Sequence, residues 1–458
     1  MPTALSTDLY ELTMMAGYYA AGIRDQASFE LYVRDLPRHR SYLVAAGLEH
    51  ALDFLETLAF TPQEIEYLRQ LPILQKAPRA FFDDYLPSFR FSGEVWAPPE
   101  GTPLFEHEPL LRVTAPILEA QLVETALLAI LGFQTSIASK AARIVEVSGG
   151  RPVIEFGGRR AHGTEAARLA ARAAYLAGCA GTSNAEAGMR FGIPVSGTMA
   201  HSWVMTFEDE LEAFRAFASL YGEQSVFLID TYDTLAAAHK VVASGLRPSA
   251  VRLDSGNIVE LSRKVRDVLD AGGLHDTGIF VSGDLDEHKI AAFLSQRAPL
   301  NGFGVGTALS TSRDAPALGA IYKLVEVYRD GQLVPTMKLS PGKRSYPGRK
   351  QAWRIFERSG GGKDQESASR ACAVRDVLAL ADEPGPSGGV PLLERVMAGG
   401  RRVGETRPLP ALRERCLRHV AELPADVRGL GENARYPVVV SRGLQALADT
   451  VTESLDGV

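Results

Sequence analysis

A single histidine, His201, stands where a barrel enzyme would keep a nucleophile. It lies in the segment 197–203 (Gly-Thr-Met-Ala-His-Ser-Trp), just past the strand-like run 193–196 and near the start of a helical stretch. Imidazole is neutral and nucleophilic near pH 7, so a histidine whose second nitrogen is held by a carboxylate can accept a phosphoryl group and pass it on. Alone, a histidine in this position is more often structural, so other segments must support the hypothesis.

Polar or glycine-rich segments also follow nearly all the remaining strand-like runs. These segments are 156–160 (Phe-Gly-Gly-Arg-Arg), 181–184 (Gly-Thr-Ser-Asn), 230–233 (Asp-Thr-Tyr-Asp), 252–256 (Arg-Leu-Asp-Ser-Gly), 282–284 (Ser-Gly-Asp) and 304–307 (Gly-Val-Gly-Thr). Each one taken singly is more readily a turn or a helix cap. Together with His201 they recur in phase with the strands, and loops at the carboxyl ends of barrel strands build one site.

Glycines and arginines in these segments indicate a phosphorylated ligand. Gly283, Gly304 and Gly306 would let backbone N–H groups approach a phosphate, late in the barrel where phosphate monoesters bind. Arg159 and Arg160 offer planar guanidinium groups that suit a phosphate or a carboxylate.

Carboxylates and one ring complete the expected ligand. Asp230, Asp254 and Asp284 could bind ribose hydroxyls or carry magnesium through water, since this cation prefers oxygen ligands and substrate phosphates. Phe156 supplies a ring face for a flat heterocycle. The predicted ligand is a phosphorylated sugar beside an aromatic acid or amide.

Alternating strands and helices must position these loops. Short apolar runs bounded by Gly and Pro and separated by helical stretches such as 206–221 and 258–271 predict a parallel sheet covered by helices. The clear runs are 152–156, 193–196, 226–229, 250–253, 278–281 and 302–305, and weaker ones are 177–180 and 322–328. The pattern predicts an α/β fold with an irregular βα barrel.

Composition along the chain predicts a second, α+β domain. Residues 1–115 mix short helices with strand-like pieces such as 27–33 and 89–95. Residues 116–330 are expected to form the barrel, and they open with a long apolar helical pattern over 117–147. Residues 331–458 are expected to return to the α+β domain. Linkers are expected near 359–366 and 383–389. Lys140 and Arg143 lie one turn apart on the long helix, where we expect a solvated or dimer-facing stripe.

Overall composition narrows the class of protein. The chain has 458 residues, 46% of them hydrophobic, and a net charge of −6 with scattered cations, which argues against a nucleic acid partner. The three cysteines, Cys179, Cys372 and Cys416, show no spacing typical of disulfide frameworks or zinc clusters. The longest apolar run, 125–133, is too short to span a membrane and no basic-then-apolar leader opens the chain, so we expect a cytoplasmic protein.

Several of these motifs, in this order, resemble the nicotinate phosphoribosyltransferase family, a group of type II phosphoribosyltransferases. The likeness runs from about residue 7 to residue 354, and the last hundred residues add little. The motifs are 10–14 (Tyr-Glu-Leu-Thr-Met), 156–160, 181–184, 197–202, 252–256, 305–307, 338–340 (Lys-Leu-Ser) and 347–348 (Pro-Gly).

The resemblance implies a reaction. The enzyme would join nicotinate to 5-phosphoribosyl 1-diphosphate, giving nicotinate mononucleotide and diphosphate for NAD biosynthesis and salvage. ATP hydrolysis would be coupled through a phosphorylated histidine, with Mg²⁺ as cofactor, and a homodimer would share its active sites across the subunit interface.

The resemblance also implies roles for individual residues. His201 would carry the phosphoryl group, Asp230 would orient it, and Phe156 would stack on the pyridine ring, with Tyr10 of a second subunit closing the sandwich. The expected catalytic residues are His201, Asp230 and Asp254. The expected substrate-binding residues are Tyr10, Phe156, Arg159, Ser183, Thr198, Arg252 and Ser255. The expected phosphate-binding residues are Gly283, Asp284, Gly304, Gly306, Thr307, Lys338 and Ser340.

One position bears on the choice of pyridine. Nicotinamide-using relatives carry an Asp where this chain has Ser183, and a carboxylate there would repel the carboxylate of nicotinate. Ser183 therefore favours nicotinate. Asn257 departs from the Asp expected in nicotinate enzymes, and we expect it to cap a helix, where Asn and Asp serve alike.

Three alternatives remain open. A nicotinamide phosphoribosyltransferase would share the fold and the histidine. A decarboxylating quinolinate phosphoribosyltransferase would need a more cationic pocket and no ATP-linked histidine. A non-catalytic barrel that senses a nucleotide would not need so complete a polar set.

Overall fold

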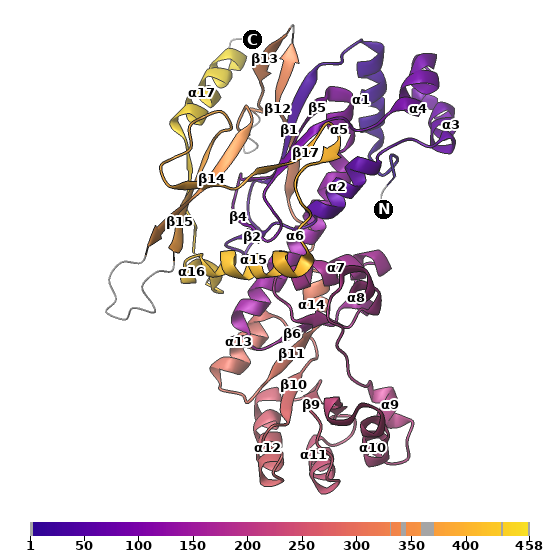
Figure 1. The fold of residues 1–458 in the computed structure, drawn as a ribbon, viewed down its shortest axis with the longest axis vertical. Helices are drawn as coiled ribbons and strands as arrows, with labels where there is room; N and C mark the ends of the chain where they lie inside the picture. Colours follow the sequence, from indigo (N-terminus) through magenta and orange to yellow (C-terminus); the bar gives the residue numbers. More distant parts are fainter. Residues whose placement is uncertain (1–2, 330, 340–344, 359–370, 432–433, 457–458) are drawn as a thin grey trace. The chain divides into compact units, whose positions relative to one another are not determined.

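Contacts divide the chain into two compact units (Figure 1). The computed structural model describes residues 3–329, 331–339, 345–358, 371–431 and 434–456. We call Ile137–Pro316 the barrel unit, and Met1–Ser136 with Ala317–Val458 the sheet unit. Both ends of the chain therefore contribute to one α+β unit, as the sequence predicted. Ser340 and the expected linker 359–366 lie outside the described residues.

The barrel unit is built on six parallel strands. Their order is β7-β6-β11-β10-β9-β8, and an isolated parallel bridge between Thr182 and Val195 extends the series beyond β7. The strands are β6 Val153–Glu155, β7 Gly181–Thr182, β8 Val226–Leu228, β9 Ala250–Leu253, β10 Gly278–Val281 and β11 Gly302–Val305. The structure describes this unit throughout, and no strand pairing joins Val195 to β8. The predicted irregular βα barrel is therefore confirmed, and it is open between these two segments.

Helices follow the strands of the barrel unit in turn. They are α7 Thr164–Leu176, α8 Ala185–Phe191, α9 His201–Met205, α10 Glu210–Tyr221, α11 Thr234–Ala243, α12 Ile258–Ala271, α13 Glu287–Ser295 and α14 Thr307–Ser310, with η3 Gly158–Arg160 and η4 Gly222–Gln224. Several polar residues after strands cap these helices: Asn184, Asp233, Asn257 and Asp286 each accept a backbone N–H with the side chain. The capping expected of Asn257 is confirmed.

The sheet unit contains a seven-stranded sheet of order β13-β12-β1-β5-β3-β17-β18, a four-stranded sheet of order β16-β14-β15-β19, and the pair β2-β4. Its strands are β1 Gln26–Val33, β2 Leu43–Val44, β3 Glu94–Ala97, β4 Pro103–Leu104, β5 Pro109–Pro116, β12 Ala320–Arg329, β13 Gln332–Pro335, β14 Lys350–Arg358, β15 Ala371–Leu380, β16 Gly389–Pro391, β17 Glu394–Ala398, β18 Arg401–Arg402 and β19 Val438–Val440. Every position of β1 after Gln26 is buried, so both faces of this strand are covered.

Helices of the sheet unit complete its core. They are α1 Leu9–Ala20, α2 Leu48–Thr57, α3 Pro62–Gln70, η1 Pro72–Leu74, η2 Phe81–Tyr85, α4 Leu86–Ser88, α5 Ile117–Leu122, α15 Leu409–Ala421, α16 Ala425–Arg428 and α17 Arg442–Asp456. The long helical pattern over 117–147 forms two helices, α5 and α6 (Glu124–Val147). Val123 separates them. No described helix has the length and apolar character needed to cross a bilayer.

Two expectations about individual elements are wrong. The run 322–328 is not a weak barrel strand: it lies in β12, which pairs antiparallel with β1 in the sheet unit. An apolar run predicts a strand but not which sheet receives it, because its partners lie far away in the sequence. The run 89–95 yields only β3, which begins at Glu94.

Lys140 and Arg143 are buried, against our expectation of a solvated or dimer-facing stripe. Each side chain is 3% exposed. The ammonium of Lys140 lies 2.6 Å from Glu287 and 2.8 Å from Asp314, and Nε of Arg143 lies 3.2 Å from Glu287. Helical spacing places both cations on one face. Only the fold brings them the carboxylates that offset the desolvation cost of burying their charge.

Glu287 is the first residue of α13 and is shared by both cations. We expect Glu287→Ala to lower the free energy of unfolding by about 3 kcal/mol, because it removes a buried carboxylate from two buried cations. Urea unfolding measures the change. Glu260→Ala, which breaks the exposed pair with Lys264, should leave stability unchanged, and equal effects of the two substitutions would contradict this account.

Candidate active site

Two pockets open in the barrel unit at the carboxyl ends of its strands. One of ≈540 Å³, called here the large pocket, and one of ≈360 Å³, the small pocket, are both lined by Phe156, Arg159, Arg252 and Asp254. The large pocket also contains Ser255, Gly283, Asp284, Gly304, Gly306 and Thr307, and the small pocket Ser183, Thr198 and His201. The structure thus brings together most of the expected site residues in two pockets, and four of these residues form a wall that the pockets share.

Three expected site residues that the structure describes, Asp230, Tyr10 and Lys338, line neither pocket. Asp230 is described below. Tyr10, on α1, and Lys338, after β13, belong to the sheet unit, and Ser340 lies outside the described residues. The Tyr10 side chain is about half exposed, and the Lys338 backbone N–H donates to Ser345. The roles assigned to these residues stay predictions.

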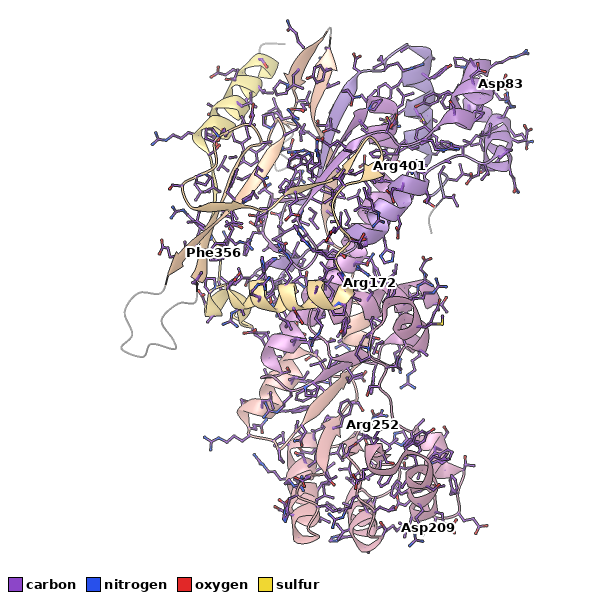
Figure 2. The ribbon with its side chains drawn as sticks, in the orientation of Figure 1. Asp83, Arg172, Asp209, Arg252, Phe356 and Arg401 are labelled. Carbon is purple, nitrogen blue, oxygen red and sulfur yellow. The ribbon has the colours of Figure 1, made fainter. Side chains whose placement is uncertain are left out.

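Arg252, labelled in Figure 2, connects the loops around the shared wall. It extends from β9, and its guanidinium donates to the Ser282 hydroxyl at 2.7 Å, to the Thr198 hydroxyl at 3.0 Å and to Asp254 Oδ1 at 2.6 Å. The same group lies 5.8 Å from the centre of the Phe156 ring. One fork-shaped cation therefore holds the segments that follow β6, β9 and β10 and the segment that follows the isolated bridge at Val195.

Asp254 is held in its charged form by this network. Burial by itself would raise its pKa, but hydrogen bonds from Ser282 and Arg252, together with the positive charge of Arg252, lower the pKa below its ordinary value. The side chain remains 28% exposed and lines both pockets. An ionised carboxylate therefore faces the place where the pockets meet.

His201 begins α9 and does not contact Asp230. Its Nδ1 lies 3.1 Å from the Thr231 hydroxyl. Asp230 Oδ2 instead accepts from the Asp254 backbone N–H at 2.9 Å and from the Ser255 hydroxyl at 2.8 Å, while its Oδ1 is buried without a hydrogen-bond partner. The expected contact between His201 and Asp230 is therefore absent, because neighbouring side chains at a strand end point in different directions.

Sequence reasoning missed Thr231 and Ser282 as partners of the expected site residues. Both stand in the polar segments that follow β8 and β10, so their place was visible, but hydroxyl groups at such positions are usually caps. It also missed Lys289 on α13, which lines the large pocket and donates to the Asp284 backbone carbonyl at 2.8 Å.

Packing explains two of the expected phosphate-binding glycines. A Cβ at Gly304 would lie 2.5 Å from the Phe156 ring, so a larger residue here would displace the ring from its observed position. Gly283 has φ +94°, and a Cβ there would overlap the Asp254 carbonyl oxygen. Asp284, with φ +47°, is one of the few residues other than glycine in the left-handed region, and its exposed carboxylate lines the large pocket. Such backbone strain is typical of functional loops.

Charge around the pockets suits an anionic ligand. The cations Arg159, Arg160, Arg252 and Lys289 line the large pocket, against the carboxylates of Asp254 and Asp284. Arg159 is exposed and hydrogen-bonds to no described residue, so its guanidinium is available to a ligand. In the described part of the chain, no three His, Cys, Asp or Glu side chains converge as a metal site would require.

Comparisons with known proteins agree with the sequence motifs. The model of the nicotinate phosphoribosyltransferase (NAPRTase) N-terminal domain matches residues 5–132, and that of the nicotinate phosphoribosyltransferase (NAPRTase) family matches residues 152–357. Nicotinate phosphoribosyltransferase pncB2 of Mycobacterium tuberculosis is 45% identical, over 96% of this chain and 91% of its own. Nicotinate phosphoribosyltransferase of Bacillus subtilis is 44% identical, over 78% of this chain and 74% of its own.

A solved structure extends the likeness to the fold. The crystal structure of human nicotinic acid phosphoribosyltransferase superimposes with a TM-score of 0.82 at 29% identity, covering 97% of this chain and 99% of that one. With two family models and close relatives over nearly its whole length, this chain belongs to the nicotinate phosphoribosyltransferase family.

Proposed function

We propose that this enzyme binds nicotinate in the small pocket and 5-phosphoribosyl 1-diphosphate in the large pocket, and joins them into nicotinate mononucleotide in NAD salvage, with release of diphosphate. The observation that carries the proposal is the shared wall of Phe156, Arg159, Arg252 and Asp254. Two ligands in these pockets would meet there. The anomeric carbon of the sugar and the ring nitrogen of nicotinate would then face each other, which is the approach that bond formation needs.

The small pocket has the groups that nicotinate needs. Phe156 offers a ring for stacking, and the free guanidinium of Arg159 can pair with the carboxylate. Ser183, exposed after β7, carries no charge that would repel that carboxylate. We also propose a homodimer in which Tyr10 of a second copy covers the pyridine ring.

The large pocket has the groups that the sugar needs. Backbone N–H groups near Gly283 and Gly306, with Arg160 and Lys289, can hold phosphate oxygens. As the bond to diphosphate breaks, the anomeric carbon becomes cation-like, and the ionised Asp254 lies at the wall to stabilise that charge. The arrangement accounts for ribosyl transfer without a decarboxylation step, so it does not call for the dicarboxylate quinolinate as substrate.

Magnesium fits the large pocket through one protein carboxylate. Asp284 is exposed there, and its carboxylate has no hydrogen-bond or ion-pair partner among the described residues. We propose that Asp284 holds Mg²⁺ together with water and diphosphate oxygens, since this ion commonly takes few protein ligands. Bound there, it would supply positive charge to the leaving diphosphate.

ATP coupling is proposed to pass through His201. In the tautomer whose Nδ1–H donates to the Thr231 hydroxyl, Nε2 would attack the γ-phosphorus of ATP, the bond from that phosphorus to the β,γ-bridging oxygen would break, and ADP would leave. Water would later cleave the phosphohistidine and restore the imidazole. A phosphohistidine would add negative charge and acceptor oxygens beside the cations of the wall, which would order the surrounding loops around the sugar diphosphate.

The phosphohistidine can be tested directly. We expect the protein incubated with γ-labelled ATP to acquire an acid-labile phosphate, and His201→Ala to abolish it. His239→Ala, an exposed histidine on α11 that lines neither pocket, serves as the matched control and should keep the label. Label retained in His201→Ala would remove this residue from the coupling.

Pyridine choice can be tested at Ser183. We expect Ser183→Asp to lower kcat/KM for nicotinate at least about tenfold, because a carboxylate in the small pocket repels that of the substrate. Activity with nicotinamide should fall less or rise. Ser196→Asp, which adds the same charge at an exposed position outside both pocket walls, should leave nicotinate turnover unchanged. Equal losses in the two variants would argue against nicotinate binding beside Ser183.

A further inference from the structure

Glu155, the last residue of β6, is a fully buried carboxyl group with no cationic partner in the barrel unit, which the structure describes throughout. Burying a carboxyl group is costly unless its oxygens are hydrogen-bonded. Here Oε1 accepts from the Gly157 backbone N–H at 2.5 Å, and Oε2 accepts from the Thr182 hydroxyl at 2.6 Å. Both oxygens are therefore used, each by a different segment of the chain.

Those two segments carry the small pocket. Gly157 directly follows Phe156, whose ring lines the pocket, and Thr182 directly precedes Ser183. The Ser183 backbone N–H also donates to the Glu155 carbonyl at 2.9 Å. One buried residue thus holds the two segments that bring the ring of Phe156 and the uncharged hydroxyl of Ser183 to the lining of the pocket.

Further contacts make this connection stiff. The Thr182 hydroxyl accepts the backbone N–H of Asn184 at 3.0 Å, and Asn184 in turn caps α8. On the other side, Gly157 has no room for a Cβ beside Ser310, whose hydroxyl donates to the Gly157 carbonyl at 3.2 Å. Neither segment can shift without breaking a buried hydrogen bond.

We propose that Glu155 is a positioning residue for pyridine specificity: by holding Gly157 and Thr182 together, it sets the separation of Phe156 and Ser183 and so the preference for nicotinate over nicotinamide. The inference rests on the proposed binding of nicotinate in the small pocket. Glu155 itself contacts no substrate, because it lines neither pocket.

The chemistry of the carboxyl group suggests the substitution to use. A carboxylate accepts at both oxygens, whereas an amide accepts at one and donates at the other. Glu155→Gln therefore keeps the size of the side chain but not its two acceptors. Its N–H₂ group either faces the N–H of Gly157, or donates to the Thr182 hydroxyl, which already accepts from Asn184 and then loses the acceptor of its own O–H. Burial raises the pKa of Glu155, while the hydrogen bonds from Thr182 and Gly157 act against this rise.

The test compares steady-state kinetics with each substrate varied in turn. We expect Glu155→Gln to raise KM for nicotinate about tenfold, the cost of one lost buried hydrogen bond. The KM for 5-phosphoribosyl 1-diphosphate should stay within about twofold, and the ratio of kcat/KM for nicotinate to that for nicotinamide should fall. A purely structural role would instead move both KM values or the amount of folded enzyme.

A pair of variants at Thr182 keeps the test decisive if Glu155→Gln does not fold. Thr182→Val removes the hydroxyl at constant shape and should reproduce the loss of selectivity, while Thr182→Ser keeps the hydroxyl and should restore it. Glu210→Gln, a buried carboxyl on α10 that lines neither pocket, is the control and should alter neither KM.

The outcomes separate this inference from the proposed function. Unchanged nicotinate KM and unchanged selectivity in folded Glu155→Gln and Thr182→Val enzymes would overturn the role of Glu155. Parallel increases of both KM values would overturn it as well. A wild-type enzyme without turnover of nicotinate would overturn the proposed function itself.

Discussion

The guanidinium of Arg252 is the interaction on which the site depends. Segments after three strands of the barrel and after the isolated bridge at Val195 meet at this group, through Ser282, Asp254, the ring of Phe156 and Thr198. A lysine could not replace it, because a single ammonium lacks the fixed, divergent donors of the planar fork. The same contacts that order the loops keep Asp254 ionised, so the arrangement of the backbone and the electrostatics of the site have one cause.

Buried carboxyl groups recur in the barrel unit, each time at the start or end of an element that carries the site. Glu287 begins α13, directly after the loop that contains Gly283 and Asp284, and it is held by Lys140 and Arg143. Glu155 ends β6 and holds two segments that line the small pocket. Buried groups of this kind add little net stability, but they permit one arrangement of their hydrogen-bond and ion-pair partners and penalise others.

Two pockets that share a wall favour a reaction between two ligands over the binding of one. Beyond the shared wall, the small pocket is lined by hydroxyls and a histidine, and the large one by glycines, two further cations and the carboxylate of Asp284. This division matches the difference between a pyridine acid and a sugar phosphate. Membership of the nicotinate phosphoribosyltransferase family gives the reaction, and two adjoining pockets of different chemistry are compatible with it.

The sequence by itself determined the family, the alternation of strands and helices, and the segments that carry the chemistry. This was possible because the carboxyl ends of parallel strands lie at one edge, so residues such as Phe156, His201 and Asp254 had to meet. Only the tertiary structure decided the partners: Thr231 beside His201 in place of Asp230, the carboxylates around Lys140, and the sheet that receives residues 322–328. Local patterns encode periodicity and residue chemistry, whereas side-chain direction and contacts between distant segments arise when the whole chain packs.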